Sequence, residues 1–330
     1  MPPAEDAASL PPAGPAGEPG SDHPAVIAVV VTYNRRELLL EALAAVHAQS
    51  RPPDAVIVIY NASADESAAA VRKRYPSVQL AELARNTGGA GGFAGGMALA
   101  LADGADLIWL MDDDTVPEPG ALAALLAARR AYRGRPPAVI ASRAVWTDGR
   151  AHPMNTPRTK PLVTRSERAA ADAAGCLPIR SASFVSILVD AAQCRRRGLP
   201  QADYFLWNDD FEFTTRLLRG NIGLLCPASV VVHKTAAFGS TDADPGPRFF
   251  YEVRNKVWTL RARSLAPAER VLYGGSTVRR WARTYAKSGD RAALRSALVR
   301  GIAAGVTTSP RPTADVLTDA GLALPAGLPD

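Results

Sequence analysis

Three consecutive carboxylates, Asp112, Asp113 and Asp114, follow an apolar run at residues 107–111. Adjacent like charges repel, so the triplet disfavours folding unless a positive charge lies among them. In an extended segment, side chains at positions i and i+2 share a face, which lets Asp112 and Asp114 converge on one divalent cation while Asp113 faces another group. A site with only a few oxygen ligands from the protein is typical of Mg²⁺ or Mn²⁺, which take phosphate oxygens as further ligands. The competing interpretation is an acidic cap for the helix expected near Pro119.

A second acidic group, Asp209, Asp210 and Glu212, lies at the start of a predicted helix. The helix dipole stabilises acidic residues in a first turn, which is the structural interpretation. The functional interpretation is a general base, because a carboxylate beside a substrate hydroxyl can accept its proton as the oxygen attacks. His233 ends an apolar run at 228–232. A lone histidine is more often structural, but at a strand end near carboxylates it could complete the shell of a cation.

A glycine-rich segment at residues 85–97 contains six glycines in thirteen residues. Glycine lets a backbone approach a ligand closely and leaves N–H groups free for phosphate. The segment is neither a Walker A loop nor a GxGxxG motif after a strand, so an ATPase or a dinucleotide enzyme is poorly supported. The alternative is a flexible loop followed, from residue 92, by a helix packed through small residues.

Apolar runs alternate with segments of helical periodicity through the first half of the chain, which predicts a doubly wound α/β sheet with mostly parallel strands. Ligands gather at the carboxyl ends of strands in such a sheet, and the aspartate triplet lies at one of these ends, which favours the cation site. The predicted strands are residues 25–32, 55–60, 78–83, 106–111 and 138–143.

The second half has a different pattern. Residues 147–180 are polar and weakly periodic, which predicts a mobile loop or an excursion, and one strand is expected at 181–189 and one or two more at 223–233. Helical periodicity begins at Arg248, and the last residues, rich in Pro, Ala and Leu, are expected to be loosely ordered. The predicted organisation is a disordered Pro/Ala-rich tail at 1–24, a catalytic domain at 25–245 and a basic helical region at 246–330.

Composition restricts the classes of protein. The net charge is +6, and thirteen Lys or Arg stand against three Asp or Glu from Arg248 to Arg300. Such a segment suits phosphates or anionic lipid, or it is a solvated helix face. It matches no nucleic-acid-binding module, so no nucleic acid is expected as a partner. Three scattered cysteines without a CxxC pair argue against a zinc site or a disulfide framework and fit a reducing cytoplasm.

Seven motifs occur in an order that resembles glycosyltransferase family 2: VVVTYNR, YNASADES, NTGGAGGFAGGM, WLMDDDT, WNDDFEFTTRL, VVH and RFFYEVRN. The glycine segment and the aspartate triplet are most similar to bacterial galactofuranosyltransferases and their rhamnosyltransferase-like relatives. The resemblance covers roughly residues 25 to 260. It implies a GT-A fold, in which a nucleotide-binding sheet of mostly parallel strands is flanked by helices, here with a C-terminal helical extension. It also implies a nucleotide-diphosphate sugar donor and Mn²⁺ or Mg²⁺.

The resemblance also implies roles for individual residues. Asp112, Asp114 and His233 correspond to the metal ligands and Asp210 to the catalytic base, with Trp207, Asp209 and Glu212 on the acceptor side. The donor side corresponds to Thr32, Tyr33, Arg35, Tyr60, Asp65, Asn86, Gly88, Gly89, Gly91, Gly92 and Asp113. The sequence departs from the family at Tyr60, where an aspartate usually contacts the nucleotide base. A tyrosine can stack on a base or donate a hydrogen bond, but it cannot accept the imino proton, so uridine and thymidine both remain open.

The resulting hypothesis is an inverting, metal-dependent transfer of galactofuranose or a rhamnose-like sugar to a hydroxyl of a glycan, lipid-linked or small-molecule acceptor. The alternatives are a nucleotidyltransferase, a glycoside hydrolase using two carboxylates without metal, and a non-catalytic sugar-nucleotide-binding relative. Arg279, Arg280, Arg283 and Lys287 surround Trp281 on a predicted helix, which could lie on an anionic membrane surface or pack on the catalytic domain. The expected location is therefore cytoplasmic, with peripheral contact at the inner face of the membrane as the open extension.

Overall fold

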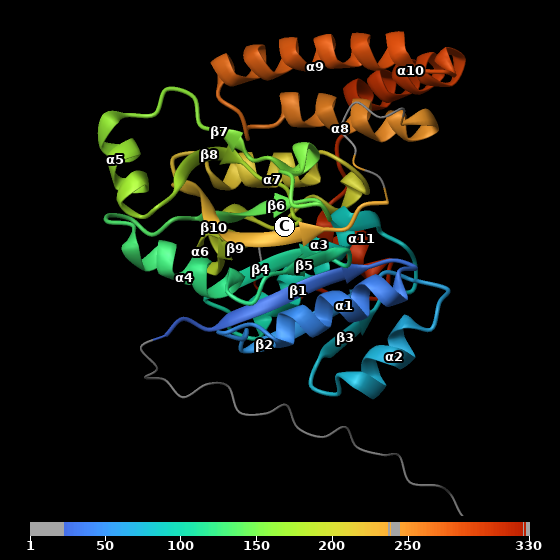
Figure 1. Cartoon of the computed structure of the whole chain (residues 1–330). Helices are drawn as coiled ribbons and strands as arrows, with labels where there is room; N and C mark the ends of the chain where they lie inside the picture. The colour runs from blue at the N-terminus through green and yellow to red at the C-terminus, as the bar shows by residue number, and fades with distance from the viewer. Residues whose placement is uncertain (1–22, 237, 239–244, 326, 328–330) are drawn as a thin grey trace, which may run out of the picture.

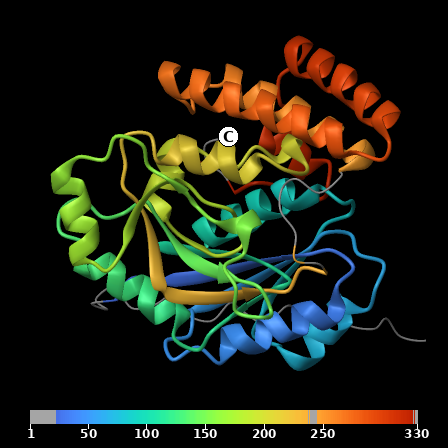
Figure 2. The same ribbon diagram turned by 45° about the horizontal axis from the view of Figure 1, so that its top comes forward.

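The computed structural model describes residues 23–236, 238, 245–325 and 327, so the tail predicted at residues 1–24 lies almost entirely outside the described part. The centre of the molecule is a 10-stranded sheet with the strand order β3-β2-β1-β4-β9-β6-β10-β8-β7, in which β5 (Thr115–Pro117) pairs with the end of β10. Figures 1 and 2 show this sheet with helices on both faces and the C-terminal helices stacked over one side.

Most strands of the sheet run in one direction, as predicted. β9 (Ile187–Asp190) is inserted antiparallel between β4 and β6, which therefore remain parallel to each other. The long parallel runs are apolar at nearly every position because helices cover both faces of the sheet. The strands that share the main direction are β1 (Val26–Thr32), β2 (Ala55–Tyr60), β3 (Gln79–Glu82), β4 (Leu107–Asp112), β6 (Val139–Val145) and β10 (Gly223–His233).

Two layers of helices bury the sheet, and alternate side chains of β1 point into each layer. Ile27 and Val29 pack in one core, which contains α3 (Gly88–Ala102), α6 (Ala191–Arg197) and α7 (Asp209–Leu217). Val26 and Ala28 pack in the other core, which contains α1 (Arg36–His47), α2 (Ser67–Arg74) and α4 (Ala121–Ala131). The two layers hold the carboxyl ends of β1, β2 and β4 at one edge of the molecule.

Helix α3 begins at Gly88, so the prediction of a loop up to residue 92 is wrong. The glycines form the first turns of the helix because tertiary packing outweighs their poor helix propensity. A Cβ atom on Gly92 would lie 2.4 Å from Cγ1 of Val31, which is closer than any real contact. The absence of a side chain therefore lets α3 lie directly against β1.

The region 147–180 is structured, so the prediction of a mobile loop is wrong. It contains a 3₁₀ turn η1 (Pro153–Asn155), β7 (Arg158–Thr159), α5 (Arg165–Ala173) and β8 (Leu177–Ser181). The side chain of Thr164 caps α5 by accepting from the N–H of Glu167. A T-x-x-E pattern is the sequence signature of such a cap. The single strand predicted at 181–189 is also wrong in extent, since β8 ends at its first residue, Ser181, and β9 begins only at Ile187.

The chain ends in helices, as predicted from residue 248 onward. A short turn η3 (Gly246–Arg248) leads into α8 (Phe249–Arg261), which is followed by α9 (Pro267–Lys287) and α10 (Arg291–Thr307). The prediction of a loosely ordered end is wrong for α11 (Thr313–Thr318), whose Leu317 is fully buried against Ala94 of α3. Among the described helices, not one is both long and apolar enough to cross a membrane.

Candidate active site

The aspartate triplet and His233 meet because the chain reverses directly after β4. Asp113 and Asp114 form a turn, and β5 then pairs antiparallel with the end of β10, with Thr115 opposite His233. The N–H of Lys234 donates to the carbonyl oxygen of Asp114 at 2.8 Å. This register brings Nε2 of His233 to 3.0 Å from Oδ1 of Asp114.

Asp112, Asp114 and His233 form a cluster that could hold a cation. Each presents one ligand atom, and these atoms lie within 4.8 Å of one another. Oδ1 of Asp114 is buried and forms no regular hydrogen bond with the described residues, although Nε2 of His233 lies 3.0 Å from it. An unsatisfied buried carboxylate oxygen disfavours folding, and a bound cation would satisfy it. The donor set of two carboxylates and one imidazole fits Mn²⁺ or Mg²⁺.

The imidazole of His233 is oriented by a residue that the sequence did not reveal, Asn155. Oδ1 of Asn155 lies 2.8 Å from Nδ1 of His233, and its Nδ2 donates to Oγ of Ser183 at 3.2 Å. Since Oδ1 can only accept, Nδ1 carries the proton, and in the neutral ring the lone pair is on Nε2, which faces Asp114. Such an outer partner fixes the tautomer of a metal-ligating histidine. Asn155 lies in the weakly periodic region, so no sequence pattern marked it.

Arg35 supplies the positive charge that the triplet requires. Its Nη1 lies 2.6 Å from Oδ2 of Asp114 and 3.3 Å from Oδ1 of Asp113. Burial alone would raise the pKa of Asp114, but the charged form of His233 and Arg35 hold it below its ordinary value. Burial raises the pKa of Asp113 to about 6 against the opposing effect of Arg35. Burial and the two neighbouring carboxylates raise the pKa of Asp112 well above its ordinary value.

Asp113 points away from the cluster, toward the end of β1. Its Oδ2 accepts from Oγ1 of Thr32 at 2.8 Å and from the N–H of Tyr33 at 3.2 Å. Thr32 is buried, whereas the side chain of Tyr33 is about half exposed. The structure therefore places Asp112 and Asp114 on one side of the turn and Asp113 on the other, beside the residues expected to meet the donor.

Tyr60 and Asp65 hold the loop after β2 through contacts within the loop itself. The buried hydroxyl of Tyr60 lies 2.6 Å from the carbonyl oxygen of Asp65 and 2.8 Å from that of Ser63. Asp65 accepts from Oγ of Ser67 at 2.6 Å and from the N–H of Arg36 at 3.1 Å. The single hydroxyl proton of Tyr60 is therefore used within its own loop.

The glycine segment is anchored by Asn61, another residue that the sequence analysis did not single out. Oδ1 of Asn61 accepts from the N–H of Thr87 at 2.8 Å, and its Nδ2 donates to the carbonyl oxygen of Gly88 at 2.8 Å. Asn86 accepts from the N–H of Gly88 at 2.7 Å.

The glycines of this segment have unequal surroundings. Gly88 has a φ of +69°, and a Cβ there would lie 1.9 Å from the carbonyl oxygen of Phe205. A Cβ on Gly91 or Gly92 would collide with Thr87 or Val31, whereas Gly89 has open space around it. Of these four glycines, Gly89 is therefore the one whose surroundings leave room for a ligand.

A strained segment precedes the second acidic group. Phe205, Trp207 and Asn208 have φ values of 62°, 65° and 66°, which non-glycine residues rarely adopt. Asn255 of α8 opposes this segment, and its Nδ2 lies within 2.8–2.9 Å of the carbonyl oxygens of Tyr204, Leu206 and Trp207. Strain of this kind persists only where surrounding contacts determine the conformation. Asn255 is thus a further residue of the site that sequence reasoning missed, although it closes the motif RFFYEVRN.

Asp209 is buried and Asp210 is half-buried in the first turn of α7. Burial raises the pKa of both carboxyl groups, and Asp210 raises that of Asp209 further. Lys256 and Arg158 oppose the shift at Asp210, and burial in turn lowers the pKa of Lys256 to about 7. Asp209 also raises the pKa of Asp112, so the two acidic groups are close enough to interact. Trp207, two residues before this turn, exposes 37% of its surface.

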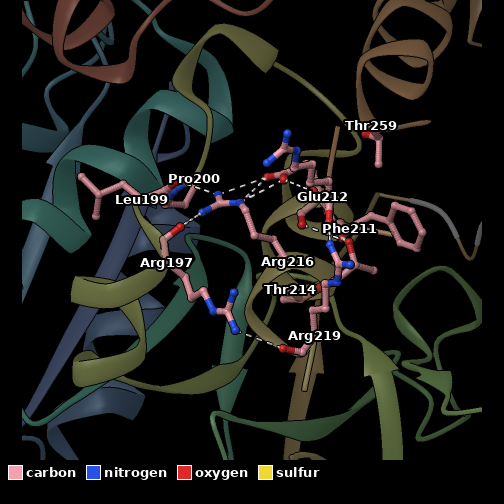
Figure 3. A network of polar contacts seen from close by, with 12 residues as sticks. Arg197, Leu199, Pro200, Phe211, Glu212, Thr214, Arg216, Arg219 and Thr259 are labelled. Carbon is pink, nitrogen blue, oxygen red and sulfur yellow. Dashed lines mark hydrogen bonds and ion pairs between the residues drawn. The ribbon is translucent and has the colours of Figure 1, made fainter. Parts of the chain in front are cut away.

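Glu212 faces a different direction from Asp210, since two residues turn an α-helix through about 200°. Its carboxylate accepts from Nε of Arg216 at 2.9 Å and from Oγ of Ser264 at 2.5 Å. Figure 3 shows Glu212 and Arg216 within a network of arginines. The structure therefore brings Asp209 within electrostatic reach of the aspartate triplet, whereas Glu212 forms its ion pair with Arg216 on another side of the helix.

Comparison with known proteins agrees with this architecture. Residues 27–194 match the family described as Glycosyl transferase family 2. Galactofuranosyltransferase GlfT1 of Mycobacterium tuberculosis is 33% identical over 255 residues, which cover 71% of this chain and 82% of that protein. Galactofuranosyltransferase GlfT1 of Mycolicibacterium smegmatis is 32% identical and covers 76% and 88%.

Solved structures share the fold at low sequence identity. The structure of S. aureus TarS 1–349 in complex with UDP-GlcNAc has a TM-score of 0.60 at 14% identity, covering 88% of this chain and 83% of that one. The chain spans half the length of the longer TarS structure (50%). Mannosyltransferase PcManGT from Pyrobaculum calidifontis, solved with GDP-Man and Mn²⁺, has a TM-score of 0.51 at 20% identity, covering 92% and 81%. The fold is of the GT-A type, and the chain belongs to glycosyltransferase family 2 as a galactofuranosyltransferase-like enzyme.

Proposed function

We propose that this enzyme transfers galactofuranose from a nucleotide-diphosphate donor to a hydroxyl of a glycan acceptor, with inversion and with a divalent cation. The observation that carries the proposal is the cluster of Asp112, Asp114 and His233 with its unsatisfied carboxylate oxygen. The names of the curated relatives favour galactofuranose over a rhamnose-like sugar. The acceptor hydroxyl belongs to a free or a lipid-linked glycan.

Asp112, Asp114 and Nε2 of His233 would hold Mn²⁺ or Mg²⁺, and Asn155 would keep the ring of His233 in the required tautomer. When bound, the cation supplies Lewis-acid stabilisation of the diphosphate leaving group. Arg35 lies beside the same carboxylates and adds a fixed positive charge at this edge. Thr32, Tyr33 and the loop after β2 would bind the nucleotide, with Asp113 positioned by Thr32 to face the donor.

Asp210 would accept the proton of the acceptor hydroxyl as that oxygen attacks the anomeric carbon. Burial raises its pKa above the ordinary value of a carboxyl group, which makes it a stronger base, while Lys256 and Arg158 favour its ionised form. One base on the acceptor side is sufficient for direct displacement with inversion. Trp207 would offer its exposed ring to the acceptor.

The test is Asp210→Asn, assayed with UDP-galactofuranose and Mn²⁺ by release of UDP on an acceptor panel. We expect a loss of about 10²–10⁴-fold in turnover, because the amide cannot accept the proton. The matched control is Asp172→Asn, at an exposed position of α5. Near wild-type turnover by Asp210→Asn would remove the assignment of the base. Full activity in EDTA would instead favour a metal-independent hydrolase, and donor binding without turnover a non-catalytic relative.

The metal assignment has its own test in Asn155→Ala. Loss of the partner of Nδ1 should weaken Mn²⁺ binding by about 10–100-fold, measured by calorimetry without substrate. Asn221→Ala serves as the control, because Asn221 bonds to Gln193 and Leu217 at the far end of α7. Equal Mn²⁺ affinity of the two variants would contradict the role of Asn155.

We propose, in addition, that the outer face of the C-terminal helices contacts an anionic membrane. α9 exposes Val271, Leu272 and Val278, and α10 exposes Val299 and Val306. Exposed aliphatic side chains next to arginines are typical of helices that lie in a lipid interface. This pairing of apolar and basic residues favours the membrane over a merely solvated basic face.

The membrane contact is tested by co-sedimentation with phosphatidylglycerol vesicles. The double variant Val271→Ser with Val278→Ser should lose most of the binding. The control is Leu162→Ser, because Leu162 is 99% exposed in a different part of the chain. Unchanged sedimentation of the α9 variant would refute the contact and leave the transfer reaction untouched.

A further inference from the structure

A cavity of about 650 Å³ lies beside α7, on the face that carries Glu212 rather than Asp210. The end of α6, the middle of α7, the end of α8 and the segment after α8 enclose it. Of the residues predicted for the active site only Glu212 lines it, so the cavity is separate from the aspartate triplet, His233 and Asp210. Its lining contains one carboxylate, Glu212, and six arginines: Arg196, Arg197, Arg216, Arg219, Arg261 and Arg263.

Only one of these arginines is neutralised by the carboxylate. Arg216 forms the ion pair with Glu212, through Nε at 2.9 Å and Nη2 at 3.1 Å. Arg261 donates to the carbonyl oxygen of Thr308 at 2.7 Å, and a neutral carbonyl leaves the positive charge in place. Within the part of the chain that the structure describes, the other five arginines have no ion pair. Glu269, which also acts on Arg219, is itself paired with Arg180 at 2.5 Å.

Several of the guanidinium groups are anchored by hydrogen bonds, although only Arg216 among the six is not exposed. Nη2 of Arg216 donates to the carbonyl oxygen of Leu199 at 2.8 Å, and Nη1 of Arg219 donates to that of Arg263 at 2.5 Å. Arg197 donates to the carbonyl oxygen of Arg219 at 3.3 Å. Figure 3 shows Arg197, Arg216 and Arg219 linked in this way around Glu212. Each anchor uses part of a guanidinium group and leaves other N–H donors for a ligand.

Arginines brought together without counter-charges repel one another, and a multivalent anion would remove that repulsion. Guanidinium groups match phosphate oxygens with paired hydrogen bonds, which makes them the preferred recognition group for phosphate. The cavity is also within the range of volumes, about 300–1,000 Å³, that hold small-molecule ligands. It therefore has more room than a single orthophosphate fills.

We propose that this cavity binds a phosphate anion of several charges, such as a diphosphate or a phosphorylated small molecule, at a site separate from the donor site. The same chemistry could be offered by a free phosphate compound or by the headgroup of an anionic lipid. The proposal does not depend on the transfer reaction or on the sugar.

The test is calorimetric titration of the full chain with inorganic pyrophosphate in EDTA, so that no cation can hold the probe at the aspartate triplet. The cavity variant combines Arg196→Glu with Arg263→Glu. The control combines Arg130→Glu with Arg133→Glu at the exposed end of α4. Each pair replaces one arginine in the last turn of a helix and one in a loop, and both pairs change the net charge by the same amount.

We expect wild type and control to bind pyrophosphate with similar affinity and the cavity variant to bind at least about tenfold more weakly. An equal loss in both variants would show that only overall charge matters, which would overturn the proposal. It would also be overturned if wild type bound neither pyrophosphate nor phosphatidylglycerol vesicles. Citrate binding as tightly as pyrophosphate would refute phosphate as the ligand class.

The two sources are separated by repeating the comparison with phosphatidylglycerol vesicles. If the cavity variant loses pyrophosphate but sediments with vesicles like the control, the ligand is a soluble phosphate compound. If it loses both, the ligand is a lipid headgroup. The double variant of α9, Val271→Ser with Val278→Ser, should bind pyrophosphate like wild type even if it no longer binds vesicles. This proposal and the membrane contact can therefore fail independently.

Discussion

Replacing Asn255 by alanine removes the amide that holds the strained segment before α7, and we expect it to lower both stability and turnover. The side chain of Asn255 is fully buried and has three carbonyl oxygens within reach of Nδ2. The amide carries two hydrogens, so it satisfies two of these acceptors at a time. Its loss leaves buried acceptors without a donor, at about 1–3 kcal/mol each. The expected decrease in the free energy of unfolding is therefore about 2–4 kcal/mol.

The effect on turnover follows from the backbone conformation. Phe205, Trp207 and Asn208 keep positive φ values that each disfavour the folded state by about 1–3 kcal/mol, so the segment relaxes when its restraint is removed. Asp210 lies two residues after Asn208, so relaxation of the segment would displace its carboxylate. A shift of about 1 Å at a reacting group reduces the rate by about 10²-fold. We therefore expect a turnover loss of this size at temperatures where the variant is still folded.

Urea unfolding followed by circular dichroism and UDP release in the transferase assay measure the two effects. Asn221→Ala is the matched control, because Nδ2 of Asn221 also makes two hydrogen bonds, at 2.8 Å and 3.0 Å, but away from the strained segment. It should lose about 1 kcal/mol and keep its turnover. If Asn255→Ala lost stability but retained wild-type turnover when folded, the positioning role would be refuted.

Two other predictions concern packing and buried charge. Gly92→Ala should lower the free energy of unfolding by about 1–3 kcal/mol, because the new Cβ would lie 2.4 Å from Val31. Gly89→Ala is the control, because Gly89 has open space around it and the substitution should be neutral or stabilising. Equal midpoints of urea unfolding for the two variants would contradict this prediction. The folded state lowers the pKa of Lys256 to about 7, so unfolding takes up a proton between about pH 7 and 10 and the wild type gains stability as pH rises through this window. Lys256→Met should therefore be more stable than wild type by about 1 kcal/mol or more at pH 6–7, with the difference shrinking toward pH 10. A difference that grows with pH would show that attraction to Asp210 outweighs the burial of Lys256.

The sequence was sufficient for the parallel core of the sheet because each of its strands is covered on both faces. A strand such as residues 55–60 is then apolar at almost every position and is bounded by helical periodicity, which leaves few alternatives. The antiparallel direction of β9 could not be predicted, because the residues ILVD have the same composition whichever way the strand runs. Helix α3 was only partly predicted, since a helix buried on all sides by glycine and alanine lacks the polar face that periodicity detects.

The site divides in the same way. The aspartate triplet and His233 were found from the sequence because each lies at the end of a buried strand, where an α/β sheet collects its ligands. Asn155 and Asn255 were missed because their roles depend on partners 78 and about 50 residues away along the chain. The arginines around Glu212 could not be predicted from the sequence either, because they come together only when α6 and α8 pack around α7.

The pairing of β5 with the end of β10 means that the candidate cation cluster is complete only after β10 has joined the sheet. Asp112 and Asp114 are synthesised about 120 residues before His233, and only the docking of β10 brings the imidazole to them. Loop closure over such a distance is among the slower steps in assembling a sheet. A nascent chain that still lacks β10 would hold three aspartates with Arg35 as their counter-charge and without the histidine. Tight cation binding would then mark chains whose sheet is complete, so incomplete chains would not compete for the metal.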